Sequence, residues 1–125
     1  MSEPVARLDR ERDVFLWGGR LAGDWIPDVV QRLVDKFDPL KIILFGSQAR
    51  DDPGRDSDID VLVVMPQVTD KHQIAVEMRR ALRDVPAPID VFATDPDEIA
   101  RRGHLVGTLL RPALREGKVL YERPG

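Results

Sequence analysis

The pattern of hydrophobic and polar residues changes at Ile26. Residues 1–24 are polar and carry Gly18, Gly19 and Gly23, so they are expected to form an arm or an irregular lead-in. From Ile26 to Phe37 apolar residues recur at helical spacing, with a proline in the first turn, and this predicts an amphipathic helix. The Asp-Pro pair that follows is expected to end it. We therefore expect one domain over residues 25–122.

Short apolar runs rich in branched residues alternate with helical patterns along the rest of the chain. The runs predict buried strands at Lys41–Phe45, Ile59–Met65 and Ile89–Ala93, and a short strand at Val119–Tyr121. Helices are expected over about residues 70–84, from the capping sequence at Asp95 onward, and over about residues 106–115. Because some strand pairs have no helix between them, this order predicts an α/β (α+β) fold, a single domain with a mixed β-sheet flanked by helices.

Composition narrows the class of protein. The chain has 125 residues, a formal net charge of −3 and no cysteine, which excludes disulfides and thiolate zinc sites. The acidic balance argues against a general nucleic-acid binder, so no direct nucleic-acid partner is expected. The amino terminus does not resemble a signal peptide, and no apolar run approaches the roughly 20 residues of a membrane helix. A cytoplasmic protein without a membrane partner is expected.

Two of the expected strands contain an acid where an apolar residue would be typical. Asp60 and Asp90 each follow an isoleucine and precede a valine, and Asp58 lies two residues before Asp60. Residues two apart on an extended chain share a face, and neighbouring strands lie about 4.8 Å apart, so the three carboxylates can converge. Buried carboxylates are costly unless they are paired or bind metal. The set predicts a site for Mg²⁺, or Mn²⁺, and two such ions about 3.5–4 Å apart serve in-line phosphoryl or nucleotidyl displacement.

The strand at Lys41–Phe45 ends in Gly46 and Ser47, which are candidate nucleotide-binding residues. Glycine lets the backbone approach a phosphate, and Ser47 offers a hydroxyl at the start of an expected short helix over residues 47–50. No Walker A or dinucleotide-binding glycine pattern is present. Phosphate binding would therefore depend on the metal ions, this turn and basic neighbours such as Arg50 and Arg55.

These residues together resemble a known signature. Gly46-Ser47, ten residues, and then Asp58-Ile59-Asp60 resemble the GS-x10-D-x-D signature of the DNA-polymerase-β-like nucleotidyltransferase superfamily. The stretch GSQARDDPGRDSDIDVLVV is similar to its minimal nucleotidyltransferase (MNT) branch, the antitoxin partners of HEPN-domain toxins. The resemblance implies the polymerase-β-like fold, and Asp58 and Asp60 as ligands of both ions. Asp90 is implied as the third acid and as base toward the incoming hydroxyl, and Gly46 and Ser47 as contacts of the triphosphate.

The resemblance also implies a reaction. AMP would pass from ATP to an acceptor hydroxyl. By the resemblance, this hydroxyl belongs to a tyrosine of a HEPN toxin, and the toxin forms a complex with this protein. Two alternatives stay open: a non-catalytic interaction module that neutralises its partner by occlusion, and a nucleotidyltransferase acting on an antibiotic. The sequence departs from the pattern at Asp51, where a glycine is common, and it shows no additional helical substrate domain.

Other chemistry-bearing residues have ordinary structural explanations. His72 and His104 are expected at the surface, and Trp17 and Trp25 are expected to pack in a core or interface. The arginines at positions 79, 80 and 83 are expected to form a solvated helix face, and Arg101 and Arg102 to face solvent or an acidic partner.

Overall fold

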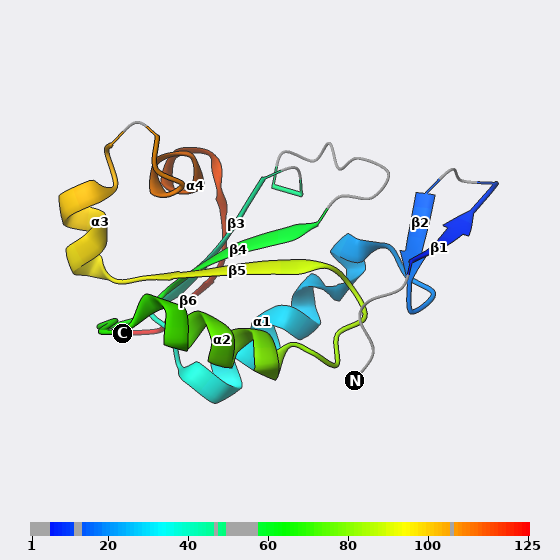
Figure 1. The fold of residues 1–125 in the computed structure, drawn as a ribbon, viewed down its shortest axis with the longest axis horizontal. Coiled ribbons are helices and arrows are strands. Elements are labelled where there is room, and N and C mark those ends of the chain that lie inside the picture. The colour runs from blue at the N-terminus through cyan, green and yellow to red at the C-terminus, as the bar shows by residue number, and fades with distance from the viewer. Residues whose placement is uncertain (1–5, 12–13, 47, 50–57, 106) are drawn as a thin grey trace.

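The computed structural model describes residues 6–11, 14–46, 48–49, 58–105 and 107–125. Along this part of the chain it forms β1 (Ala6–Asp9), β2 (Val14–Trp17), the 3-10 helix η1 (Ala22–Trp25), α1 (Ile26–Phe37), β3 (Lys41–Phe45), β4 (Ile59–Val64), α2 (Lys71–Ala81), β5 (Ile89–Thr94), α3 (Pro96–Arg102), α4 (Leu110–Glu116) and β6 (Lys118–Glu122). Figure 1 shows their arrangement.

The main sheet has four strands in the order β5-β4-β3-β6. β4 and β5 are parallel and are joined through α2, whereas β3 pairs antiparallel with both β4 and β6. A parallel pair needs a crossover connection, and α2 supplies it. The expected mixed sheet flanked by helices is confirmed.

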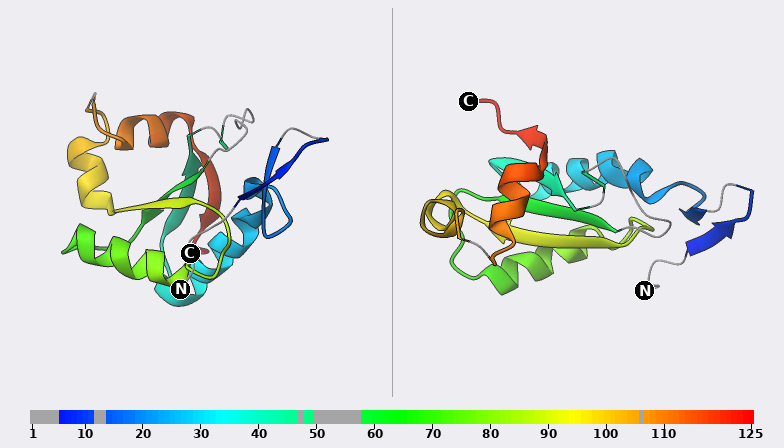
Figure 2. Two further views of the ribbon diagram at one scale, coloured as in Figure 1. Left: turned by 45° about the vertical axis from the view of Figure 1, so that its right-hand side comes forward. Right: turned by 90° about the horizontal axis from the view of Figure 1, so that it is seen from above.

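Helices cover both faces of this sheet. α1 and α2 lie on one face, and α4 crosses the other (Figure 2). The side chains of β4 alternate accordingly: Ile59, Val61 and Val63 belong to the main core with α1 and α2. Leu62 and Val64 belong to a smaller core with Leu110 and Ala113 of α4. Asp60 therefore shares the α4 face of the sheet with Leu62 and Val64.

Most expected elements match the structure closely. The helix over Ile26–Phe37 has the expected bounds, and its C-cap Asp38 adopts a left-handed conformation with φ of 48°. The helix expected over about residues 106–115 begins later, at Leu110. Gly107 has φ of 90°, outside the helical range, so the chain turns before α4 starts. The short helix expected over residues 47–50 lies partly outside the described residues; Gln48 and Ala49 form a turn.

The segment expected as an arm contains regular structure that its polar pattern did not predict. β1 and β2 form an antiparallel hairpin that projects beyond the end of the main sheet (Figures 1 and 2). Trp25 joins this segment to the core, because its indole Nε1 donates a 2.7 Å hydrogen bond to the Trp17 carbonyl. The Arg20 guanidinium lies 3.7 Å from the centre of the Trp25 ring. Both tryptophans pack against the main core, as expected, and the domain boundary near residue 25 stays a prediction.

Two further expectations concern the surface. His72, His104 and the arginines at positions 79, 80 and 83 are all exposed, as predicted. Among the described residues, no helix has the length and apolar character needed to cross a bilayer.

Candidate active site

Strand register places the two strand acids side by side. Asp60 of β4 is the partner of Asp90 in β5, and on its other side it is the partner of Phe45 in β3. Asp90, Asp60 and Phe45 thus form one row across three strands, which we call the acid row. The row lies at the end of the sheet where β3 ends and β4 and β5 begin (Figure 1).

Among the residues that the structure describes, α4 packs over the rows next to the acid row and not over the acids themselves. The next row on the same face contains Phe92, Leu62 and Ile43, and it packs under Leu110 and Ala113 of α4. In the acid row itself Asp90 is exposed, Asp60 is half-buried, and Asp58 just before β4 is exposed. The Phe45 and Phe92 rings, 5.7 Å apart, connect the two rows. The site is therefore a solvent-exposed surface, which we call the shelf, and apolar residues packed against α4 border it on one side.

The electrostatics of Asp60 show how crowded the carboxylates are. Burial raises its pKa to about 6, and the charges of Asp90 and Asp58 and a hydrogen bond with Asp90 act in the same direction. Every group that shifts this pKa is an acid, so nothing in this set neutralises the negative charge. A bound cation would relieve this repulsion.

Gly46 lies directly against Asp60. Its φ of 74° is in the left-handed region that favours glycine, and a Cβ at this position would collide with the Asp60 carboxylate. The turn is closed by the Ala49 N–H, which donates a 3.1 Å hydrogen bond to the Gly46 carbonyl. Gly23 of η1 also packs closely against this turn, since a Cβ added to Gly23 would lie 2.9 Å from Oε1 of Gln48. The Gly46 backbone therefore lies close to Asp60, and the role of Gly46 in nucleotide binding stays a prediction. Ser47 and Arg50 lie outside the described residues, and their roles also stay predictions.

The donor set fits a magnesium ion that is shared with a substrate. Within the described ranges, no group of three or more His, Cys, Asp or Glu side chains is arranged to enclose a metal. Mg²⁺ in nucleotide enzymes is commonly held by one or two carboxylates together with substrate phosphates and water, without a protein cage. Asp60 and Asp90 supply two adjacent carboxylates, and Asp58 is close enough to raise the pKa of Asp60. The ligand roles of all three stay predictions.

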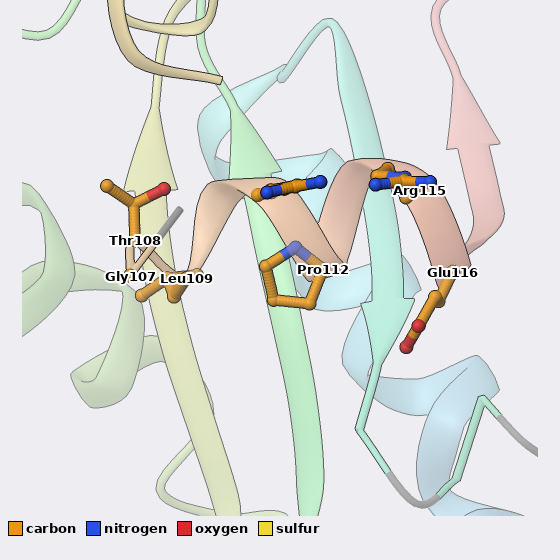
Figure 3. A pocket seen from close by; sticks show the side chains of 7 residues that line it. Gly107, Thr108, Leu109, Pro112, Arg115 and Glu116 are labelled. Carbon is orange, nitrogen blue, oxygen red and sulfur yellow. The ribbon is translucent and has the colours of Figure 1, made fainter. Parts of the chain in front are cut away.

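The structure also brings forward residues that the sequence patterns missed. Phe45 borders the acids through strand register, and only its position before Gly46 could have indicated this. An open pocket on α4 is lined by Thr108, Leu109, Arg111, Arg115 and neighbouring residues (Figure 3). A charged groove between α1 and α2 lies on the opposite face. Neither hollow includes the acids.

Comparison with known proteins agrees with this geometry. Residues 24–110 match the family of the nucleotidyltransferase domain, a range that contains Gly46, Asp58, Asp60 and Asp90. No curated protein sequence matches the chain significantly.

Two solved structures share the fold. One is a protein of Sulfolobus solfataricus, provisionally named a nucleotidyltransferase, with 21% identity and a TM-score of 0.59, covering 82% of this chain and 81% of its own. The other is a mutant of the MntA-HpeT toxin–antitoxin, with 22% identity and a TM-score of 0.55, covering 78% of this chain and 72% of its own. The expected polymerase-β-like fold is thus confirmed. Because the family match spans well over half of the sequence, the chain belongs to the nucleotidyltransferase domain family.

Proposed function

We propose that this protein is a Mg²⁺-dependent nucleotidyltransferase that transfers AMP from ATP to a tyrosine hydroxyl of a partner HEPN-domain toxin. The observation that carries the proposal is the acid row, in which Asp60 and Asp90 are register partners beside the tight Gly46 turn. Adjacent carboxylates next to a backbone turn are what a triphosphate with its cations requires.

The chain's own residues have separate roles in this reaction. Asp58 and Asp60 would hold the cations, and Mg²⁺ would supply positive charge to the triphosphate when bound. The turn at Gly46 lets backbone approach the phosphates, with Ser47 and Arg50 as further contacts. Asp90 is exposed and accepts the proton of the acceptor hydroxyl. The hydroxyl oxygen bonds to the α-phosphorus as the bond to the pyrophosphate oxygen breaks, so the work is mostly positioning and charge stabilisation.

The shape of the site supports a protein acceptor. The acid row is open to solvent, and α4 forms its only wall within the described part of that face. A protruding tyrosine can reach such a shelf, whereas a small molecule is usually enclosed by its binding pocket. The fold shared with a chain of the MntA-HpeT toxin–antitoxin supports a toxin as the partner.

The test uses the product of the neighbouring reading frame as the candidate acceptor. The two proteins are incubated with Mg²⁺ and ATP, and the partner is weighed by intact mass spectrometry. We expect a gain of one or more AMP units. Asp60→Asn should slow the transfer by about 100-fold or more, since it removes a charge from the acid row. Asp97→Asn is the matched control, because it removes the same charge from an exposed site on α3.

The alternatives give different results in the same assay. A partner that is inhibited but keeps its mass would identify a non-catalytic antitoxin acting by occlusion and would overturn the proposal. Labelling of an added aminoglycoside in place of the partner would identify an antibiotic-modifying enzyme. Replacing ATP with GTP, CTP or UTP defines the preferred nucleotide.

A further inference from the structure

The pocket on α4 is the most distinctive feature outside the acid row. It is open to solvent and combines the side chains of Leu109, Arg111, Pro112, Arg115 and Glu116 with Thr108 (Figure 3). These residues come from α4 and from the turn that leads into it. The pocket is therefore built on the helix that packs across the acid face of the sheet.

The pocket carries two cationic side chains, Arg111 and Arg115, and one acid, Glu116. Arg111 and Arg115 are one helical turn apart, a spacing at which like charges repel and destabilise a helix slightly. In the described part of the protein, neither arginine forms an ion pair, although Arg111 is partly buried. The whole chain carries a net charge of −3, so this is a local reversal of sign. Guanidinium groups at a hollow can bind carboxylates in bidentate geometry, and here two of them face the single carboxylate of Glu116.

Exposed apolar side chains lie next to these arginines. Leu109, just before α4, is 37% exposed, and Pro112 of α4 is also exposed; both line the pocket together with the arginines. Apolar contacts beside guanidinium groups are typical of protein interfaces. A nucleic-acid backbone would gain little from Leu109 and Pro112, whereas a protein segment with apolar side chains beside its acids would bury them. The surface therefore favours an acidic protein segment.

The position of α4 connects this surface to the reaction. Leu110 and Ala113 pack over Leu62, and Leu62 is two residues beyond Asp60 on the same strand face, a step of roughly 7 Å. A partner resting on α4 would extend over the acid row. By contrast, the groove between α1 and α2 lies on the opposite face, and its charges are partly compensated, with Arg32 and Asp84 3.6 Å apart. A partner bound there would not reach the acids.

We propose that the α4 pocket, with Arg111 and Arg115 at its centre, is the docking site for an acidic segment of the acceptor protein. This inference rests on the proposed function for the identity of its partner, and it adds where that partner binds. Docking on α4 holds the acceptor hydroxyl over Asp60 and Asp90. Because the docking residues differ from the acids, binding of the partner can be measured separately from the transfer of AMP.

The test measures binding without nucleotide. The product of the neighbouring reading frame is titrated calorimetrically into the wild-type protein, into Arg111→Glu/Arg115→Glu, and into Arg80→Glu/Arg83→Glu. The last pair lines the groove on the opposite face and changes the net charge equally. We expect the α4 variant to weaken Kd by roughly 30-fold or more and the control to stay near the wild-type value. In the transfer assay, the KM for the partner should rise while kcat changes little.

A second variant guards against misfolding, since Arg111 is partly buried. Arg111→Gln/Arg115→Gln keeps the polar, extended side chains, and its circular dichroism and Tm should match the wild type. Its affinity should be lower, and less sensitive to added salt, than that of the wild type. An affinity for the partner that is unchanged in both α4 variants would overturn the docking site, as would equal weakening by the control pair.

The outcomes separate the two proposals. Asp60→Asn should bind the partner normally and fail to modify it. A partner that binds through Arg111 and Arg115 but is never adenylylated would support docking and contradict the proposed function. If the α4 variant adenylylates the partner with an unchanged KM for it, the proposed function is supported and the docking site is contradicted. Binding of a single-stranded RNA that needs both arginines, with unchanged partner affinity, would replace the acidic segment by nucleic acid and overturn the docking proposal.

Discussion

At the scale of single residues, Gly46 and Asp60 constrain each other. The glycine adopts a left-handed conformation and leaves no room for a Cβ beside the Asp60 carboxylate. The carboxylate in turn is half-buried among other acids, which raises its pKa. Position 46 is therefore glycine for two reasons, and each can be tested separately.

We predict that Gly46→Ala destabilises the fold and reduces transfer. The left-handed backbone alone should cost about 1–2 kcal/mol, and the collision with Asp60 adds to this. Gly19→Ala is a matched control, because Gly19 has φ of 82° but a Cβ there would meet no atom within 4 Å. It should show the backbone cost and retain activity. Denaturant unfolding and the transfer assay measure the two effects, and equal activity of the two variants would contradict the role of Gly46.

The raised pKa of Asp60 predicts a pH-dependent stability. The folded state holds this proton more tightly than the unfolded chain, so the stabilising contribution is full below the ordinary pKa near 4 and is lost as the pH rises through about 6. Without metal, Asp60→Asn should therefore gain Tm relative to the wild type between about pH 4 and pH 7. Asp97→Asn should show no such gain. A constant difference in Tm between Asp60→Asn and the wild type across this range would contradict the shift.

At the scale of elements, the carboxyl end of β5 is fixed by a capping network. Asp95 caps α3 by accepting a 2.8 Å hydrogen bond from the Glu98 N–H, and it accepts another of 2.8 Å from the Val68 N–H. Glu98 accepts hydrogen bonds from Thr94 and Lys71, at 2.6 and 2.7 Å. These bonds connect β5, α3 and the start of α2 at the end of the sheet opposite the acid row. They fix the end of β5 opposite Asp90 against α3 and the start of α2.

We predict that Asp95→Ala lowers Tm by roughly 3–8 °C, because it removes a helix cap and a second acceptor. Asp95→Asn keeps one acceptor oxygen, so its Tm should lie between that of the alanine variant and that of the wild type. Hydrogen bonds from Glu98 and Val68 lower the pKa of Asp95, so its contribution is present above the ordinary pKa and is lost as the pH falls through the lowered value. The Tm difference between Asp95→Asn and the wild type should accordingly shrink in acid. A difference that widens there would contradict this explanation.

At the scale of the whole molecule, one face of the sheet is divided between a core and a site. α4 covers the rows behind the acid row and leaves the acids open, so ligand binding adds contacts that the protein lacks by itself. The proposed nucleotide and ion should then stabilise the fold by mass action.

We predict that Mg²⁺ and ATP together raise the Tm of the wild-type protein more than either does alone. Thermal unfolding with Mg²⁺, with ATP, with both, and with both plus EDTA measures this. EDTA should abolish the gain, and Asp60→Asn should show little of it, whereas Asp97→Asn should respond as the wild type does. Identical melting curves with EDTA and with Mg²⁺ in the presence of ATP would contradict the metal-dependent site.

The sequence alone located the elements from α1 to β6, but not β1 and β2. Helical spacing defined α1 to the residue, and the apolar runs located β3, β4, β5 and β6. Acids within two of those runs, together with Gly46-Ser47 and the spacing to Asp58, pointed to nucleotidyl transfer, and the family match agrees. These features could be predicted because periodicity and local motifs are encoded by residues close together in the chain.

Tertiary structure decided what depends on contacts between distant segments. Only strand register made Asp60 the partner of both Asp90 and Phe45, and only packing placed the Gly46 backbone against the Asp60 carboxylate. The pairing of β1 with β2 and the pocket on α4 were equally invisible in the pattern. Periodicity predicts the face of a strand or helix on which a side chain lies. The neighbours of that side chain on adjacent strands are set by long-range pairing, which no local pattern contains.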